Sequence, residues 1–240
     1  MAISGKNMTC ERAYPQEMQD ALHKFRYEAA QIIDSFCQTL KSQTPPTLYH
    51  YTDDIGLKGI LETGKLWLTD IFDLNDPSEL KRGLSLGINA LKNMVTDGPP
   101  ERATFARHAA SVEEKGIQRV AQFFACSFSS CWDDLGQWRA YADNGRGYAL
   151  GFDATALEDW FGGAAEDGPN IGYSATFPVT YRDADLINMD RLIIERMLDL
   201  ISLQRGKGLQ TDAINLYMGD LSVHLMAHIV HAALFFEHAA

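Results

Sequence analysis

The sequence lacks the features that mark secreted, membrane-spanning and zinc-finger proteins. Only four cysteines occur in 240 residues, at positions 10, 37, 126 and 131, and they form no Cys-x-x-Cys pair. Residues 1–10 contain no apolar core of a signal peptide, and no apolar run reaches the roughly 20 residues needed to cross a bilayer. We therefore expect reduced thiols and a cytoplasmic location.

Basic residues are also scarce. Lys and Arg number 21 against 32 Asp and Glu, so the formal net charge is -11. This balance argues against a protein that holds duplex nucleic acid mainly by neutralising phosphates, although a local basic groove is compatible with it. The glycine-flanked Gly145-Arg146-Gly147 is too short for a phosphate loop, and no His-Glu-x-x-His motif occurs.

The order of apolar patterns predicts an α+β fold with a small mixed or antiparallel sheet flanked by helices. Residues 18–40 have helical spacing and predict a packing helix that ends before Thr44-Pro45-Pro46. Expected strands cover residues 48–51, 65–69, 120–128, 147–152 and 175–181. Expected helices cover residues 54–62, 78–91, 103–115, 131–141, 186–204 and 213–236. With 46% apolar residues, we expect one domain with an N-terminal helix (1–46), an α+β core (47–182) and a helical C-terminal segment (183–240).

The first candidate site is the strand that ends in His50-Tyr51-Thr52. Side chains alternate along a strand, so His50 and Thr52 share one face and Tyr51 lies on the other. An imidazole can both donate and accept hydrogen bonds, which suits a nucleotide ribose. The alternative is a structural histidine whose ring is satisfied by the backbone.

The second candidate site is the turn Asn75-Asp76-Pro77-Ser78-Glu79. A rigid turn before a helix N-terminus offers fixed acids beside free backbone N–H groups, so Asp76 or Glu79 can act as a catalytic carboxylate. The alternative is an ordinary helix start, in which Asp76 or Ser78 caps the helix and Glu79 favours its first turn.

The third candidate is the aromatic segment after Ser127. Trp138 and Tyr141 are three residues apart, so they share one helical face and can stack on a base or a nicotinamide ring. The alternative is that they pack in the core. In the nucleotide hypothesis this face opens into the same hollow as His50. A metal between Cys126 and Cys131 lacks a second ligand pair.

A fourth group is the histidines of the last predicted helix. His224, His228, His231 and His238 follow one another at spacings of four, three and seven, which places them on one helical face. Such a face can bind zinc if a further ligand joins it. We assign no metal there and expect a stripe that faces solvent or an interface.

An ordered set of motifs spans residues 47–153. It comprises Leu48-Tyr49-His50-Tyr51-Thr52, Ile60-Leu61 before Gly64, Leu74-Asn75-Asp76-Pro77 with Glu79, Cys126-Ser127-Phe128-Ser129, Trp138 with Tyr141, and Gly145-Arg146-Gly147 before Gly151-Phe152. This set resembles the bacterial domain-of-unknown-function family 2971. The resemblance names a family without naming an activity.

The His-Tyr-Thr strand and the helix after it resemble, more weakly, ADP-ribosyltransferase-like folds, including DNA-modifying toxins and RNA 2'-phosphotransferases. That resemblance implies that His50 contacts the ribose and amide of NAD, and that Tyr51, Trp138 or Tyr141 stacks on nicotinamide. Family 2971 continues into a Glu-x-Glu-Trp-Arg-like segment where transferases keep their catalytic glutamate, whereas this sequence ends at Phe236-Glu237-His238-Ala239-Ala240. The usual carboxylate is absent, replaced by Asp76 or Glu79, or lies beyond the printed residues.

These patterns lead to an expected NAD-binding domain in which His50, Tyr51, Thr52, Ser127, Trp138 and Tyr141 hold the nucleotide. If active, it transfers ADP-ribose to a nucleic-acid or protein acceptor, with His50, Asp76 and Glu79 as catalytic residues. The first alternative is a non-catalytic interaction module of a bacterial stress or phage-defence system. A second alternative is a metal-dependent hydrolase that uses the C-terminal histidines.

Overall fold

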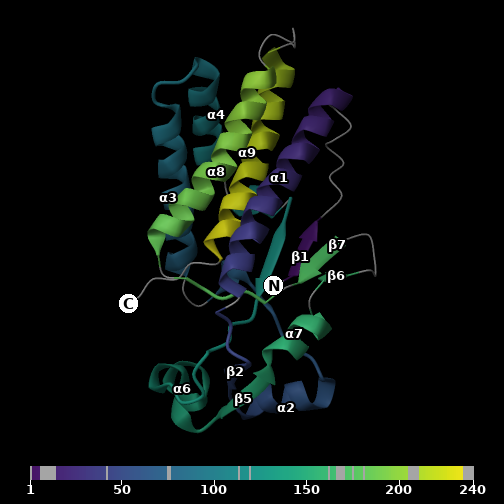
Figure 1. Ribbon diagram of the computed structural model, residues 1–240, viewed down its shortest axis with the longest axis vertical. Coiled ribbons are helices and arrows are strands. Elements are labelled where there is room, and N and C mark those ends of the chain that lie inside the picture. Colours follow the sequence, from purple (N-terminus) through teal and green to yellow (C-terminus); the bar gives the residue numbers. More distant parts are fainter. Residues whose placement is uncertain are drawn as a thin grey trace. The chain divides into compact units, whose positions relative to one another are not determined.

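The computed structural model describes residues 2–5, 15–41, 43–74, 77–112, 114–118, 120–161, 163–165, 171–174, 176–180, 182–204 and 211–234. It confirms a mixed α+β fold that is mainly helical (Figure 1). The α-helices are α1 (Gln16–Lys41), α2 (Asp54–Thr63), α3 (Pro77–Val95), α4 (Pro100–Ala110), α5 (Glu114–Ile117), α6 (Leu135–Tyr141), α7 (Ala154–Phe161), α8 (Asp183–Gln204) and α9 (Thr211–Ala233). The strands are β1 (Ala2–Gly5), β2 (Thr47–Thr52), β3 (Thr69–Asp70), β4 (Gln122–Ala125), β5 (Tyr148–Asp153), β6 (Gly163–Ala165) and β7 (Ile171–Ser174), and short 3-10 helices cover Ile71–Asp73 and Asp143–Gly145.

The chain divides into two compact units, each assembled from segments far apart in sequence. The strand unit contains residues 1–4, 40–74 and 123–177, and the helical unit contains residues 5–39, 75–122 and 178–240. The predicted arrangement as one domain of three successive segments stays a prediction.

The helical unit is built around α9. A helix that is apolar on all sides belongs in an interior, and none of the side chains described for residues 217–233 is exposed. α9 packs against α3, α4 and α8. Two glycines of α3 permit its close approach, because a Cβ atom would lie 2.5 Å from Ala233 Cβ at Gly83 and 2.6 Å from Ile229 Cγ2 at Gly87.

The first helix confirms the prediction from apolar spacing. Its buried side chains follow a stripe with intervals of three and four residues: Met18, Leu22, Phe25, Ala29, Ile33, Cys37 and Leu40. This stripe meets α9, where the buried Tyr217 hydroxyl donates a hydrogen bond to the Met18 carbonyl oxygen at 3.0 Å. α8 and α9 likewise confirm the two predicted C-terminal helices.

The strand unit contains two sheets. The larger has the order β3-β4-β1-β7-β6, and β2 pairs with β5 in the smaller. The local signals around β2 are confirmed: the Asp53 side chain accepts a hydrogen bond from Gly56 N at 2.8 Å and caps α2. Gly64 closes that helix in the left-handed conformation, with φ of 64°, which glycine adopts without steric cost.

Several predicted elements are wrong in extent. Residues 64–68 form no strand, because Trp67 is 85% exposed and Leu68 39% exposed, so neither face of the alternating pattern is buried. The predicted strand 120–128 shortens to β4, and the predicted helix 103–115 divides into α4 and α5. Of the described part of residues 175–181, only Thr180 makes a single β-bridge.

A buried carboxyl group lies on α8 within the helical unit. Asp190 is 0% exposed, and neither of its oxygen atoms has a hydrogen-bond partner among the described residues. It lies against α3 at Gly87, whose missing side chain leaves the space, since a Cβ atom there would lie 3.2 Å from Asp190 Oδ2. Desolvation by burial raises the pKa of Asp190 well above its usual value, so the folded protein holds this group in its neutral form.

The raised pKa sets the sign of a pH effect. The unfolded chain releases the Asp190 proton above about pH 4 and the folded protein keeps it, so this group lowers stability as pH rises. We expect Asp190→Asn, which does not titrate, to raise the thermal unfolding midpoint more at pH 8 than at pH 5. Each kcal/mol gained corresponds to about 2–4 °C.

Circular dichroism melts at the two pH values measure this effect. Asp199→Asn is the matched control, because Asp199 lies exposed on the same helix. Equal shifts for Asp190→Asn at both pH values would contradict a neutral buried acid.

Candidate functional site

The candidate site is built on the antiparallel pair β2–β5. Its register joins Leu48 with Phe152, His50 with Leu150 and Thr52 with Tyr148. Residues directly opposite each other project on the same side of a sheet. One side of the pair, the histidine face, therefore carries Leu48, His50, Thr52, Tyr148, Leu150 and Phe152.

The loop after β4 borders His50 on this face. His50 Nδ1 lies 3.4 Å from the Ser127 carbonyl oxygen and 3.6 Å from Cys126 Sγ. The Phe128 ring lies 5.8 Å from the imidazole and meets Phe152 edge-on at 5.9 Å. Backbone hydrogen bonds of 2.8 Å in both directions between Tyr49 and Ser129 fix the loop beside β2. The imidazole is consequently half-buried and held from one side.

Burial governs the chemistry of the neighbouring thiol. Desolvation raises the pKa of Cys126 to about 11, so the thiol keeps its proton at neutral pH. This state is unlike that of an activated cysteine nucleophile, whose pKa is lowered by nearby positive charge.

Tyr51 lies on the opposite face of β2, and its contacts there stabilise the fold. It is 6% exposed, and its ring meets the Trp138 ring edge-on at 5.0 Å between centroids. Its hydroxyl donates to the Cys131 carbonyl oxygen at 2.9 Å and accepts from the Asp134 N–H at 3.0 Å. Trp138 Nε1 donates to Asp133 Oδ1 at 2.9 Å. Tyr51 and Trp138 thus anchor α6 to β2.

The structure separates residues that we expected in one hollow. Trp138 packs on the Tyr51 face, and His50 projects from the other face of the same strand. Tyr141 is 51% exposed on α6. Thr52 is buried under the first turn of α2, where a Cβ atom on Gly56 would lie 2.0 Å from Thr52 Oγ1. Of Ser127, it is the carbonyl oxygen that lies near His50 Nδ1.

The predicted acids have no described side chains. Asp76 lies outside the described residues, and Glu79 belongs to α3 with its side chain outside them as well. Their catalytic role stays a prediction.

Sequence reasoning missed Tyr148. This residue opposes Thr52 on the histidine face and is 42% exposed, which makes it an aromatic side chain open to a ligand near His50. The only signal in the sequence is the alternation of residues 148–152. Its pairing register with β2 is set by contacts across about 100 residues.

The C-terminal histidines described by the structure turn inward, whereas we expected a stripe that faces solvent or an interface. His224 is 3% exposed, and burial together with Arg26 lowers its pKa to about 3. Burial and Arg26 also lower the pKa of His228 to about 4, and its ring meets the Phe25 ring edge-on at 5.5 Å. The helix therefore turns these imidazoles toward α1, where neutral rings pack between helices.

Among the described residues, no group of three or more side chains is placed to hold a metal ion. His238, the fourth histidine of the predicted set, lies outside those residues. None of the helices described is long and apolar enough to span a bilayer.

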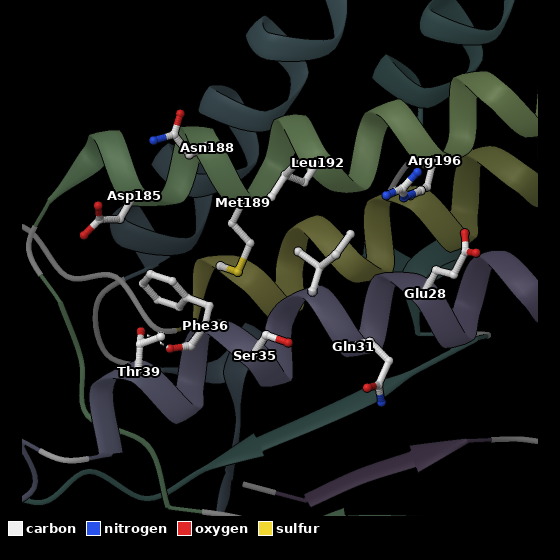
Figure 2. Close-up of a pocket in the computed structure, with 11 residues that line it drawn as sticks. Glu28, Gln31, Ser35, Phe36, Thr39, Asp185, Asn188, Met189, Leu192 and Arg196 are labelled. Carbon is white, nitrogen blue, oxygen red and sulfur yellow. Dashed lines mark hydrogen bonds between the residues drawn. The ribbon is translucent and has the colours of Figure 1, made fainter.

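A separate groove lies within the helical unit between α1 and α8 (Figure 2). It has a volume of about 650 Å³. Figure 2 shows Phe36, Met189 and Leu192 in the space between the two helices, with Glu28 and Arg196 near one end. Its lining residues are Glu28, Gln31, Ile32, Ser35, Phe36, Thr39, Asp185, Asn188, Met189, Leu192 and Arg196.

The geometry defines an α+β protein with a half-buried histidine on a two-stranded ladder. Residues 137–216 match the model of a family described as protein of unknown function (DUF2971), which supports the family resemblance predicted from the sequence motifs. The matched stretch begins within α6, after the motif of His50, and contains β5. No curated protein and no solved structure matches the chain significantly. The likeness to ADP-ribosyltransferases stays a prediction.

The Tyr51 contacts give a test of its structural role. We expect Tyr51→Phe to lower the free energy of unfolding of the strand unit by about 1–3 kcal/mol, because two hydrogen bonds are lost and the Asp134 N–H loses its acceptor. All four tryptophans, at positions 67, 132, 138 and 160, lie in the strand unit, so urea unfolding followed by tryptophan fluorescence reports on it.

The control is Tyr141→Phe, which removes a hydroxyl from a half-exposed ring. It should change the unfolding free energy by less than about 0.5 kcal/mol. Equal effects of the two substitutions would mean that the Tyr51 hydroxyl does not anchor the loop.

Proposed function

We propose that the histidine face of β2–β5 binds a nucleotide, and that NAD is the ligand to test first. The observation that carries the proposal is the register that sets His50 and the half-exposed Tyr148 on one face. They are diagonal neighbours, so their Cα atoms are roughly 7–8 Å apart by the geometry of antiparallel pairs.

The chemistry of the two side chains suits the parts of a dinucleotide. A neutral imidazole hydrogen-bonds ribose or amide groups, and a phenol ring stacks on a base or on nicotinamide. Tyr148 thereby takes the stacking role first given to Tyr51, Trp138 or Tyr141. Ser127 is exposed beside His50 and can supply a further hydroxyl.

Catalytic cleavage of NAD would need a carboxylate in addition to the binding residues. Cleavage of the nicotinamide bond develops positive charge on the ribose, which a carboxylate stabilises. Asp76 and Glu79 are the acids that the motif nominates for ADP-ribosyl transfer to a nucleic-acid or protein acceptor. The proposal for binding does not depend on them.

Calorimetric titration of NAD into the purified chain tests the proposal. We expect His50→Ala and Tyr148→Ala each to weaken binding at least tenfold, about 1.4 kcal/mol, because each removes a direct contact. Tyr141→Ala should bind as the unsubstituted chain does, because α6 borders the other face of β2. Absence of heat from every protein, or loss of binding in Tyr141→Ala alone, would remove this assignment.

The groove between α1 and α8 favours a second candidate, a non-catalytic interaction module. Its floor is apolar, and Leu192 is 48% exposed within it. Grooves between helices commonly receive the apolar face of an amphipathic helix from a partner protein. A bacterial stress or defence system is a setting in which such a module can act without chemistry of its own.

The interaction module predicts no nicotinamide release from NAD and an effect of His50→Ala on stability alone. It further predicts that Leu192→Asp keeps the thermal midpoint, since the side chain is half-exposed, but loses the partner that co-purifies from the native host, quantified by mass spectrometry. Tyr27→Asp, at a 67% exposed position of α1 outside the groove lining, is the matched control. Retention of the same partner by Leu192→Asp would contradict the proposal that the groove is its binding site.

A further inference from the structure

We infer that the Cys126 thiol donates a hydrogen bond to His50 Nδ1 and so holds the imidazole with its proton on Nε2. Cys126 is then a positioning residue that acts through His50. The relevance to a ligand rests on the proposed function, but the tautomer is a property of the protein alone.

Two groups compete for His50 Nδ1. The Ser127 carbonyl oxygen, at 3.4 Å, can only accept, so a bond to it requires the proton on Nδ1. The Cys126 sulfur, at 3.6 Å, can donate, and its bond to a bare Nδ1 requires the proton on Nε2. When the thiol is the donor, the two contacts therefore require opposite tautomers of His50.

The distances favour the thiol. An N–H···O bond usually spans about 2.7–3.2 Å, so 3.4 Å from Nδ1 to the Ser127 oxygen is long. Sulfur has a larger radius than oxygen, and 3.6 Å from Sγ to nitrogen is a normal contact for a weak thiol donor.

The hydrogen-bonding requirements of Cys126 and Ser127 favour the same tautomer of His50. Burial keeps the thiol protonated, with its pKa raised to about 11, and His50 is the hydrogen-bond partner of Cys126 among the described residues. If Nδ1 did not accept it, the thiol proton of Cys126 would have no acceptor among the described residues. The Ser127 carbonyl belongs to an exposed residue, so water can satisfy it when His50 does not.

The consequence concerns the class of ligand. His50 Nε2 makes no hydrogen bond within the described part of the chain, and in this tautomer it carries an N–H. The site then presents a donor, which selects an oxygen acceptor such as a carboxamide carbonyl, a ribose hydroxyl or a phosphate oxygen. A ligand that offers only a donor at this point would be rejected.

Nitrogen-15 NMR of the full chain with labelled histidine tests the tautomer without any ligand. Spectra at pH 8, where an ordinary imidazole is neutral, are expected to show His50 Nδ1 as the unprotonated nitrogen. The His50 signals are assigned by their loss in His50→Gln. A protonated Nδ1 in the unsubstituted chain overturns the inference, and this result needs no variant of Cys126.

Two matched variants test whether Cys126 sets the tautomer of His50. Cys126→Ala removes the donor and should move the imidazole proton of His50 to Nδ1. Cys126→Ser retains a donor and should keep that proton on Nε2. An unchanged tautomer in Cys126→Ala also overturns the inference. NAD binding is expected to weaken about tenfold in Cys126→Ala and to recover in Cys126→Ser. The expected tautomers with no heat from NAD would uphold the positioning role of Cys126 and remove the proposed function instead.

Discussion

The antiparallel pairing of β2 with β5 is the constraint on which the site depends. Because side chains alternate along a strand, a slip of one residue would bring Tyr51 to the face of His50 and turn His50 toward α6. The Tyr49–Ser129 bridge on the other edge of β2 brings the Cys126 loop alongside and limits such a slip. Backbone register, more than any single side chain, thus decides which groups meet.

The two faces of that ladder divide structural and chemical roles. Tyr51 has both hydrogen-bonding capacities of its hydroxyl used by backbone groups and its ring packed on Trp138. His50 retains an unused ring nitrogen among the described residues. A side chain whose polar atoms are all satisfied internally stabilises the fold, whereas one with a spare donor at a half-exposed surface can meet a ligand.

The sequence sufficed to predict elements that local physics determines. The stripe from Met18 to Leu40, the Asp53 cap and the Gly64 terminus required only spacing and capping rules. It also placed His50 and Tyr51 on opposite faces of one strand. The strand predicted at residues 65–69 failed because alternation alone does not supply a partner that buries one face.

Contacts between residues far apart in the chain could not be predicted from the sequence. Nothing near Tyr148 indicates that it opposes Thr52, and nothing near Cys126 indicates a contact with an imidazole of β2. The direction of the C-terminal histidines was wrong for a related reason. Helical spacing groups residues on one face, but the neighbour that this face meets, here α1 with Phe25 and Arg26, depends on tertiary packing.

The interleaving of the two units bears on how the chain is made. β2 leaves the ribosome well before β5, because a stretch of the helical unit, residues 75–122, is translated between them. At about 5–20 residues per second, the edge of β2 awaits its partner for on the order of 5–20 seconds. Throughout that interval its free N–H and C=O groups are a template for another nascent chain. The order of translation therefore leaves β2 as an unpaired edge that a chaperone would protect.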